Sequence, residues 1–285
     1  MAQSPIQEAI AYVKRHAPDF KAQIGVITGS GLSAFADKLD HRIAIEYSEI
    51  PGVVAGEVVG HSSRLILGEY AGVSVACLQG RLHRYEGIPY QSMQILVNLL
   101  KGVGCESVII TNASGSLRED VGPGELVAIN DHINFSFDSP LQGPNDDAVG
   151  PRFVSLTNTY DQEMRDSFQA LAKNMNVTLH EGVYLGVSGP CFETPAEIRM
   201  FRQLGGDVIG MSTIPDVMFA KHCGLKVAVL AAIVNLGAGM TGAELSHEHT
   251  ISEGKKCEDR MTKLILEYIE QLSPLASQKE REINV

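Results

Sequence analysis

The sequence predicts an α/β protein in which a central, mixed and mostly parallel β-sheet is flanked by helices. Short β-branched runs bounded by glycine alternate with longer segments whose apolar residues recur every three or four positions. The 285 residues are 44% hydrophobic and 20% charged, which allows a large buried core and excludes intrinsic disorder. No repeat or low-complexity linker divides the chain. We therefore expect a single domain over residues 1–285, with its core at about 20–272 and a polar tail at 273–285.

Eight segments have the length and β-branched composition of strands. They are Ile24–Thr28, Leu65–Tyr70, Val73–Leu78, Ser107–Thr111, Leu126–Ile129, Val183–Val187, Val208–Met211 and Lys226–Val234. We interpret the small residues 112–116 as a turn after the fourth of these strands. Because strands alternate with helices in this order, we expect ligands to bind beyond the carboxyl ends of the strands.

The helices are predicted from apolar periodicity and from start and stop residues. Near the N-terminus, Ile6, Ile10, Val13 and Ala17 fall on one helix face. The other helical segments are Met93–Val103, Asp161–Asn174, Thr194–Leu204, Pro215–Cys223 and Glu253–Leu272.

Net charge, apolar run length and cysteine spacing argue against several classes of binding partner and site. The net charge of −11 argues against nucleic acid and anionic membranes, which need a concentrated positive field. The longest apolar run, Val227–Val234, is far shorter than the ~20 residues that span a bilayer. Five scattered cysteines without a CxxC pair, and no signal-peptide pattern, indicate a cytoplasmic protein without a zinc or disulfide framework.

Four strands are followed by residues that can hold an anion, and after the fourth strand these are the backbone N–H groups around Ala113 in the turn at residues 112–116. The first is followed by Gly29-Ser-Gly-Leu-Ser-Ala34, a glycine turn that suits a nucleotide, another anion or a plain tight turn equally well. Arg81 and His83 follow the third strand and, two residues apart in extended chain, point to the same side. A solvated basic loop is the alternative for that pair. Ser212 precedes the helix at Pro215, where an ordinary N-cap is the alternative.

Two further segments offer groups that suit a heterocycle. Thr194-x-x-Glu197 with Pro195 forms a capping-box pattern, so we assign Glu197 to the helix and leave Glu193 available for a ligand. Asn235 ends the long apolar strand, and its amide offers both a donor and an acceptor. A turn-starting asparagine is the alternative for Asn235.

Two other function classes remain open from these residues. An NAD-dependent oxidoreductase would use the Gly29–Ala34 turn together with Glu46, but it leaves Arg81, His83 and Glu193 without a role. A non-enzymatic nucleoside- or phosphate-binding protein would use the same residues without turnover. His247 and His249 have no third ligand nearby, so we expect no metal site.

Taken together, the motifs resemble those of the trimeric purine nucleoside phosphorylases, in the branch that prefers 6-oxopurine nucleosides. The resemblance covers about residues 20–272. It is carried, in order, by Gly29-Ser-Gly-Leu32, Gly60-His61, Gly80-Arg-Leu-His-Arg-Tyr-Glu-Gly87, Thr111-Asn-Ala113, Asp131-His-Ile-Asn134, Gly143-Pro-Asn-Asp146, Gly189-Pro-Cys-Phe-Glu-Thr194, Gly210-Met-Ser-Thr213, His222-Cys-Gly224 and Asn235.

The resemblance implies reversible phosphorolysis of inosine, guanosine and xanthosine-type nucleosides in purine salvage, by a homotrimer. It implies no metal or organic cofactor, because inorganic phosphate is a co-substrate. His83, Glu193 and Asn235 would be catalytic. The implied phosphate ligands are Ser30, His61, Arg81, His83, Ala113 through its backbone N–H, and Ser212.

The same resemblance assigns the nucleoside contacts. The purine would be bound by Glu193, Asn235, Phe192 and Val234, and the ribose by Tyr85, Tyr184, Met211 and His247. His249 is the alternative to His247, which we prefer because Leu245-Ser246-His247 matches the bacterial members better. Phe153 would close the pocket of a neighbouring subunit. The sequence departs from the family pattern at Val234, where many members have threonine, and at Ser62, Ser63 and Ser114, which replace alanine or glycine.

Overall fold

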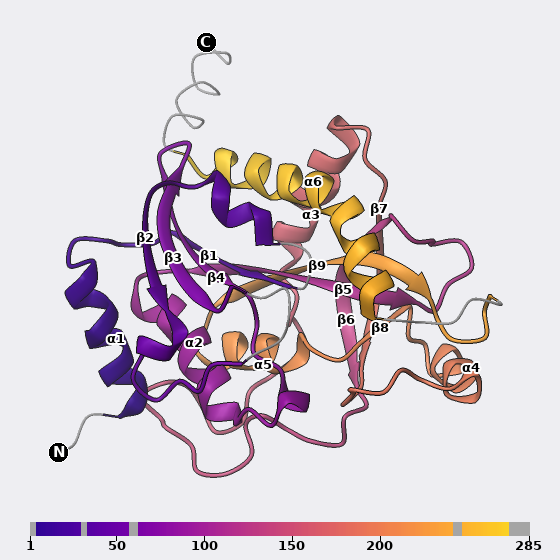
Figure 1. The fold of residues 1–285 in the computed structure, drawn as a ribbon, viewed down its shortest axis with the longest axis horizontal. Helices are drawn as coiled ribbons and strands as arrows, with labels where there is room; N and C mark the ends of the chain where they lie inside the picture. The colour runs from indigo at the N-terminus through magenta and orange to yellow at the C-terminus, as the bar shows by residue number, and fades with distance from the viewer. Residues whose placement is uncertain (1–3, 30–32, 57–61, 242–246, 274–285) are drawn as a thin grey trace.

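The computed structural model describes residues 4–29, 33–56, 62–241 and 247–273, and within them a nine-stranded sheet in the order β2-β3-β4-β1-β5-β8-β7-β6-β9 (Figure 1). The strands are β1 (Ile24–Thr28), β2 (Asp40–Glu46), β3 (Arg64–Tyr70), β4 (Val73–Gln79), β5 (Ser107–Ser116), β6 (Leu126–Asn134), β7 (Leu179–Gly186), β8 (Val208–Gly210) and β9 (Lys226–Leu236).

One end of this sheet closes on itself. Strand β5 pairs with β9 as well as with β1 and β8, and β9 also pairs with β6. The five strands β5, β8, β7, β6 and β9 therefore form a ring, and β1–β4 extend from it as an open sheet. Five of the pairings are parallel and four antiparallel. The predicted mixed, mostly parallel sheet is confirmed, but its closure had no signal in the strand pattern.

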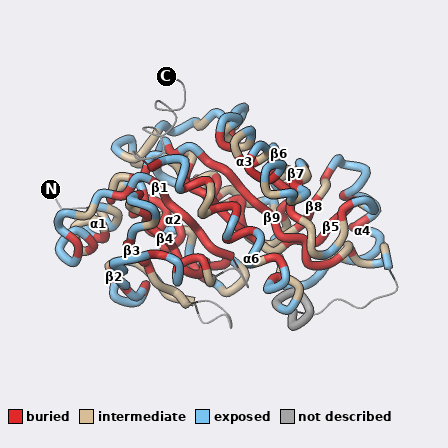
Figure 2. Tube along the Cα trace, turned by 90° about the horizontal axis from the view of Figure 1, so that it is seen from above, coloured by how far each residue is buried: buried red, intermediate tan, exposed pale blue. Residues whose placement is uncertain are grey.

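Helices cover both faces of the sheet (Figure 1). Helices α1 (Pro5–His16), α2 (Tyr90–Gly102) and α5 (Ile214–His222) pack into one apolar core, and α3 (Gln162–Asn174) and α6 (His247–Gln271) pack into another. Helix α4 (Pro195–Gln203) covers a smaller cluster beside the ring. Buried residues follow the strands and the inner sides of the helices, as Figure 2 shows. This burial explains why the apolar periodicity predicted the helices well.

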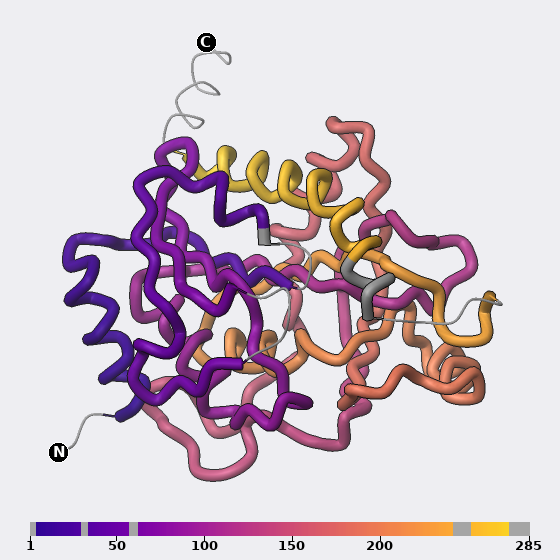
Figure 3. The backbone as a smooth tube through the Cα atoms, viewed as in Figure 1, coloured from indigo at the N-terminus to yellow at the C-terminus, as the bar shows by residue number. Residues whose placement is uncertain are grey.

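The C-terminal helix α6 meets an early segment of the chain in the second core. Figure 3 shows α6, from the C-terminal end, running beside the 3₁₀ segment Ser33–Lys38 from the N-terminal part. The Ala34 amide donates to the Glu258 carboxylate of α6 over 2.7 Å. The contact anchors the chain just after the glycine turn that follows β1.

Two predictions about strands were wrong. The strand Asp40–Glu46 was not predicted, because it lies at the sheet edge with nearly every residue exposed and so lacks an apolar face. Residues 112–116 were interpreted as a turn, but they continue β5. Their backbone pairs with β9 throughout, and the last two residues also pair with β8. Small residues are accommodated here because strands approach from both sides.

The position of β2 also removes the basis of the oxidoreductase alternative. Glu46 ends β2, which is separated from β1 by β3 and β4. Its backbone N–H donates to the Glu49 carboxylate over 3.3 Å at the start of a local 3₁₀ turn. A ribose-binding acid would have to lie beside the glycine turn after β1.

Within the described residues, no helix is long and apolar enough to cross a membrane.

Candidate functional site

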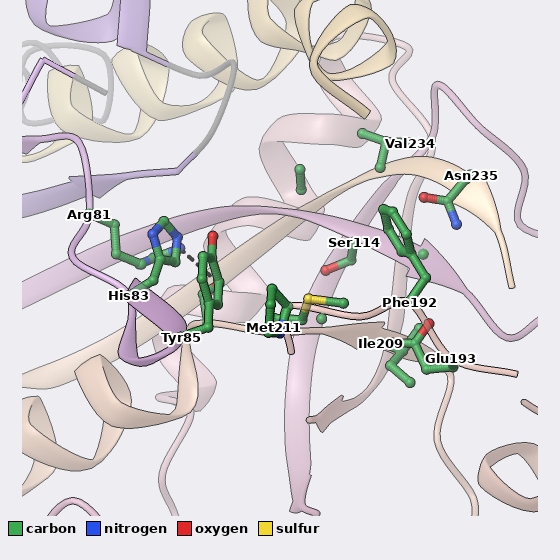
Figure 4. A pocket seen from close by; sticks show the side chains of 15 residues that line it. Arg81, His83, Tyr85, Ser114, Phe192, Glu193, Ile209, Met211, Val234 and Asn235 are labelled. Atoms are coloured by element: carbon green, nitrogen blue, oxygen red, sulfur yellow. Dashed lines mark hydrogen bonds between the residues drawn. The ribbon is translucent and has the colours of Figure 1, made fainter. Parts of the chain in front are cut away.

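A cavity of about 350 Å³ opens beside the ends of β4, β8 and β9 and the C-terminal part of β5. Its two ends differ in chemistry (Figure 4). Arg81, His83 and Tyr85 lie at one end, and Glu193 and Asn235 lie at the other with Phe192 and Val234. Met211 lies between the two groups. The cavity is of the size that accommodates small-molecule ligands.

The antiparallel pairing of β8 with β5 explains why residues distant in sequence meet here. Gly115 pairs with Ile209, so the chain leaving β8 runs back along β5 towards Ala113. This direction places Met211 and Ser212 in the same cavity lining as Ala113. The predicted site residues from these two segments are thus brought together by a pairing between strands about 90 residues apart.

Arg81 is buried, with 5% of its surface exposed, and three hydrogen bonds fix its guanidinium. Its Nε donates to the Asp216 carboxylate over 2.6 Å, its Nη1 to the Ser212 hydroxyl over 3.2 Å, and its Nη2 to the Thr111 carbonyl over 3.1 Å. Burial raises the pKa of Asp216, and the Arg81 guanidinium opposes that rise. The result is a buried, oriented cation at the cavity wall.

His83 has a carboxylate behind it. Its Nδ1 and its backbone N–H both contact Glu86 Oε1, at 2.8 and 3.0 Å. A carboxylate acceptor there favours the tautomer with its proton on Nδ1 and fixes the orientation of the ring. The Tyr85 ring stacks on the imidazole with centroids 4.7 Å apart, and burial raises the pKa of Tyr85 to about 12. Both Arg81 and His83 line the cavity, as their spacing predicts.

The segment carrying Ser212 adopts a strained backbone. Thr213 has φ 58° and ψ −58°, and the Ile214 amide donates to the Ser212 carbonyl over 2.6 Å, which is a γ-turn. The Asn112 amide donates to the Thr213 hydroxyl, which also contacts the Ser212 hydroxyl. A β-branched residue adopts this conformation only when its surroundings impose it. Hydrogen bonds from β5 thus help to set the direction of the Ser212 side chain.

The two neighbouring glutamates have different environments, as predicted. Glu197 forms a capping box with Thr194 at the start of α4, with the Thr194 amide donating to its carboxylate over 2.7 Å. These bonds lower the pKa of Glu197. Glu193 lines the cavity instead, and burial raises its pKa. Its carboxylate is therefore placed against whatever occupies the cavity.

A β-bulge places two consecutive β9 residues in the cavity wall. Ser114 pairs with Ile233 and Gly115 with Asn235, so Val234 is an extra residue in β9. In a regular strand, Val234 and Asn235 would point to opposite faces, whereas both line the cavity here. A Cβ on Gly115 would lie 2.9 Å from Asn235 Nδ2, so the absence of a side chain at Gly115 makes room for the amide.

Some predicted residues lie elsewhere. Tyr184 does not line the cavity: it is fully buried behind it, where its hydroxyl accepts from the Ser212 amide over 3.4 Å. We therefore correct its predicted ribose contact to support of the Ser212 segment. Phe153 is 89% exposed and also outside this cavity. Ser30, His61 and the side chain of His247 lie outside the described residues.

Sequence reasoning missed several residues of the site, among them Glu86, Asp216, Ile209 and Gly115. Glu86 had a usable signal, since it follows His83 by three residues in a helical turn. Asp216, Ile209 and Gly115 had none, because their roles depend on contacts between separate elements. Among the described residues, there is no cluster of three or more His, Cys, Asp or Glu that could hold a metal ion.

Comparisons with known proteins show the family to which this fold belongs. The model of the phosphorylase superfamily matches residues 23–270. Purine nucleoside phosphorylase 1 of Geobacillus stearothermophilus is 40% identical over 256 residues, which are 90% of this chain and 93% of the relative. A structure of isoform 2 of purine nucleoside phosphorylase from Schistosoma mansoni, in complex with cytosine and ribose-1-phosphate, superposes with a TM-score of 0.90. It is 34% identical and covers 95% of this chain and 97% of its own.

A structure of the S. mansoni phosphorylase in complex with inosine gives a TM-score of 0.89 at 32% identity, covering 94% of this chain and 96% of its own. The superfamily match, the identity to the bacterial enzyme and the two superpositions extend over nearly the whole chain. This chain therefore belongs to the purine nucleoside phosphorylase family.

Proposed function

We propose that the chain catalyses reversible phosphorolysis of 6-oxopurine ribo- and deoxyribonucleosides, yielding the free base and α-(deoxy)ribose 1-phosphate. The observation that carries the proposal is one cavity with a buried arginine–histidine end and a carboxylate–amide end. Inosine, guanosine and xanthosine are 6-oxopurine nucleosides, so their bases offer the groups that the carboxylate–amide end would bind. The S. mansoni complex with inosine supports a purine nucleoside as the substrate.

The basic end suits inorganic phosphate. Arg81 offers a planar guanidinium and His83 an imidazole backed by Glu86, both lining the cavity with Ala113 and Ser212. Charge-assisted hydrogen bonds to an oxyanion are the strong class of such bonds. Ser30 and His61 complete the proposed phosphate site on the strength of the family resemblance.

The opposite end suits the purine. Glu193 accepts from N1–H of a 6-oxopurine, and the Asn235 amide donates to O6 while its carbonyl oxygen addresses N7–H of the leaving base. Phe192 and Val234 provide apolar contact with the ring. Adenosine has an amine at position 6 and no N1 proton, so it mismatches both polar groups.

The proposed chemistry uses the two ends together. As the glycosidic bond breaks, positive charge develops on the ribose and negative charge on the base. Phosphate held beneath the sugar stabilises the positive charge and then forms a bond to C1′ with inversion. Asn235 and Glu193 stabilise the departing base through hydrogen bonds that strengthen as its charge grows.

The remaining assignments concern the ribose, the neighbouring subunit and the cellular role. Met211 lies between the two ends of the cavity, where the ribose would be, and Tyr85 lies at the basic end beside it. His247 would orient the 5′-hydroxyl. Phe153 would close the site of a neighbouring subunit in a homotrimer. We propose a cytoplasmic enzyme of purine salvage that uses no metal or organic cofactor.

A phosphate-dependent spectroscopic assay tests the proposal. We expect turnover of inosine only in the presence of phosphate, and discrimination against adenosine of about 10²–10⁴-fold from two buried mismatches. Asn235→Asp should depress inosine turnover and raise the adenosine-to-inosine ratio of kcat/KM. Efficient adenosine turnover, or an unmoved ratio, would contradict the 6-position assignment. Inosine binding without turnover would identify a non-enzymatic binding protein.

The phosphate assignment has its own test. Arg81→Ala should raise the KM for phosphate, measured at saturating inosine, because it removes a charge-assisted fork worth about 1.5–3 kcal/mol. A phosphate KM and kcat equal to those of the wild type would place phosphate elsewhere.

A further inference from the structure

We propose that Asp216 is a positioning residue for phosphate, which acts by fixing the orientation of the Arg81 guanidinium. The inference rests on the proposed phosphate site. Asp216 does not line the cavity, so it acts through Arg81 rather than on the substrate.

The contact between the two side chains is short and dry. Arg81 Nε lies 2.6 Å from Asp216 Oδ2, and the two side chains are 3% and 6% exposed. The other two guanidinium nitrogens contact Ser212 and the Thr111 carbonyl, so β5 and the segment from Ser212 to Asp216 together hold the planar group at all three nitrogens. A planar fork held at three nitrogens cannot rotate about its long side chain without breaking a bond.

Asp216 is itself well anchored. It lies in the first turn of α5, and its neighbours Ile214 and Val217 are fully buried in the core shared with α2. The short aspartate side chain has little freedom there, so the position of α5 determines where the carboxylate lies. The same helix begins directly after Ser212 and Thr213. Asp216 therefore couples the guanidinium to the helix that also carries a second proposed phosphate ligand.

Stability alone does not account for this pair. Buried ion pairs are weak stabilisers, because desolvation offsets most of the attraction and apolar side chains of similar volume often serve as well. Arg81 lines the cavity and Asp216 lies behind it, which is the arrangement of a ligand-binding cation with its orienting carboxylate. We therefore assign the ion pair the task of orienting the Arg81 guanidinium towards the phosphate.

Two conservative variants separate position from charge. Asp216→Asn keeps an acceptor oxygen in place and loses the charge, whereas Asp216→Glu keeps the charge and moves the carboxylate by one methylene. We expect the phosphate KM to stay within about 3-fold for Asp216→Asn and to rise at least about 10-fold for Asp216→Glu, with the inosine KM little changed. The reverse order would show that charge, not position, matters and would overturn the inference.

Asp120→Asn is the matched control, because Asp120 makes an arginine ion pair with Arg118 at the surface, with its side chain 68% exposed. Its phosphate KM should equal that of the wild type. If Asp216→Glu lowers only the melting temperature and the yield, with phosphate KM unchanged, the residue is structural and the inference fails. If Asp216→Glu does not fold, Asp216→Ala and the phosphate-induced rise in melting temperature give the same comparison against Asp216→Asn.

A double-mutant cycle tests whether Asp216 acts through Arg81. Asp216→Ala should raise the phosphate KM at least about 10-fold in the wild type, but have little further effect in Arg81→Ala. Equal effects in both backgrounds would overturn the inference. Failure of the proposed function looks different, since the wild type would then show no phosphate-dependent turnover at all.

Discussion

Glu193 and Glu197 show how neighbouring residues of one type acquire different tasks. The Thr194 amide and hydroxyl both donate to Glu197 at the start of α4, whereas Glu193 precedes the cap and faces the cavity. The difference is visible in the sequence, because Thr194, Pro195 and Glu197 form a capping box that excludes Glu193.

Substitution should therefore separate activity from stability. Glu193→Ala should leave the melting temperature nearly unchanged while kcat/KM for inosine falls at least about 10²-fold, as expected for loss of a charged partner of the substrate. Glu197→Ala should lower the melting temperature and largely keep the activity. Thermal unfolding and steady-state kinetics on both variants check this, and the opposite pattern would mean that cap and ligand are exchanged.

The pKa values of the two glutamates predict opposite pH signatures. The cap lowers the pKa of Glu197, so its stabilisation is complete above the ordinary glutamate value and is lost as pH falls through the lower folded value. The stability difference between wild type and Glu197→Ala should therefore vanish in acid. Unfolding free energies measured between neutral pH and pH ~3 check it. A difference that persists there would contradict the cap.

Burial raises the pKa of Glu193, so its carboxylate becomes protonated at a higher pH than an ordinary glutamate. A protonated Glu193 loses the negative charge that strengthens its hydrogen bond from the purine N1–H. The advantage of wild type over Glu193→Gln in kcat/KM for inosine should shrink as pH falls towards that raised value. Phosphate titrates equally in both assays, so the ratio isolates Glu193. A ratio independent of pH would exclude an ionised Glu193.

At the level of elements, the β-bulge in β9 opposite β5 determines where Val234 and Asn235 lie at the purine end of the cavity. Val234 is the extra residue, and Gly115 on the facing strand leaves space for the Asn235 amide. Gly115→Ala should displace that amide, because the new Cβ would lie 2.9 Å from Nδ2. We expect kcat/KM for inosine to fall at least about 10-fold with the phosphate KM unchanged.

Gly122→Ala is the control for this substitution, since a Cβ there meets only Glu125 Oε2 at 3.9 Å. It should behave as the wild type in both assays. Full activity of Gly115→Ala would show that the amide has room to move and that the bulge does not position it.

For the whole molecule, the exposed Phe153 predicts sites shared between subunits. The Phe153 residue is 89% exposed and its ring lies near Arg152, not in the core, so it is accessible to a neighbouring subunit. Phe153→Ala should raise the nucleoside KM, while sedimentation should give the proposed trimer for both the wild type and the variant. Co-expression with Arg81→Ala should restore activity, because the Arg81→Ala subunit supplies Phe153 to an intact phosphate site. Mixed trimers no more active than the two variants would contradict the shared site.

The sequence by itself determined the α/β class, the eight apolar strands and the six helices, because burial imposes a local periodicity that is legible in the residues. It also predicted Arg81, His83, Glu193 and Asn235 as site residues, since each follows or ends an element where a ligand is expected, and all four line the cavity. The capping box separated Glu193 from Glu197 for the same local reason.

Only the tertiary structure decided the closure of the ring, the exposed edge strand β2 and the bulge at Val234. These features depend on which strands pair, and pairing partners far apart in sequence leave no periodic signal. Long-range contacts also place Tyr184 behind the cavity. They place Asp216 against the guanidinium of Arg81, although the two residues are 135 positions apart in the sequence. Local pattern thus identifies which residues can act, whereas strand pairing and helix packing determine how they are oriented.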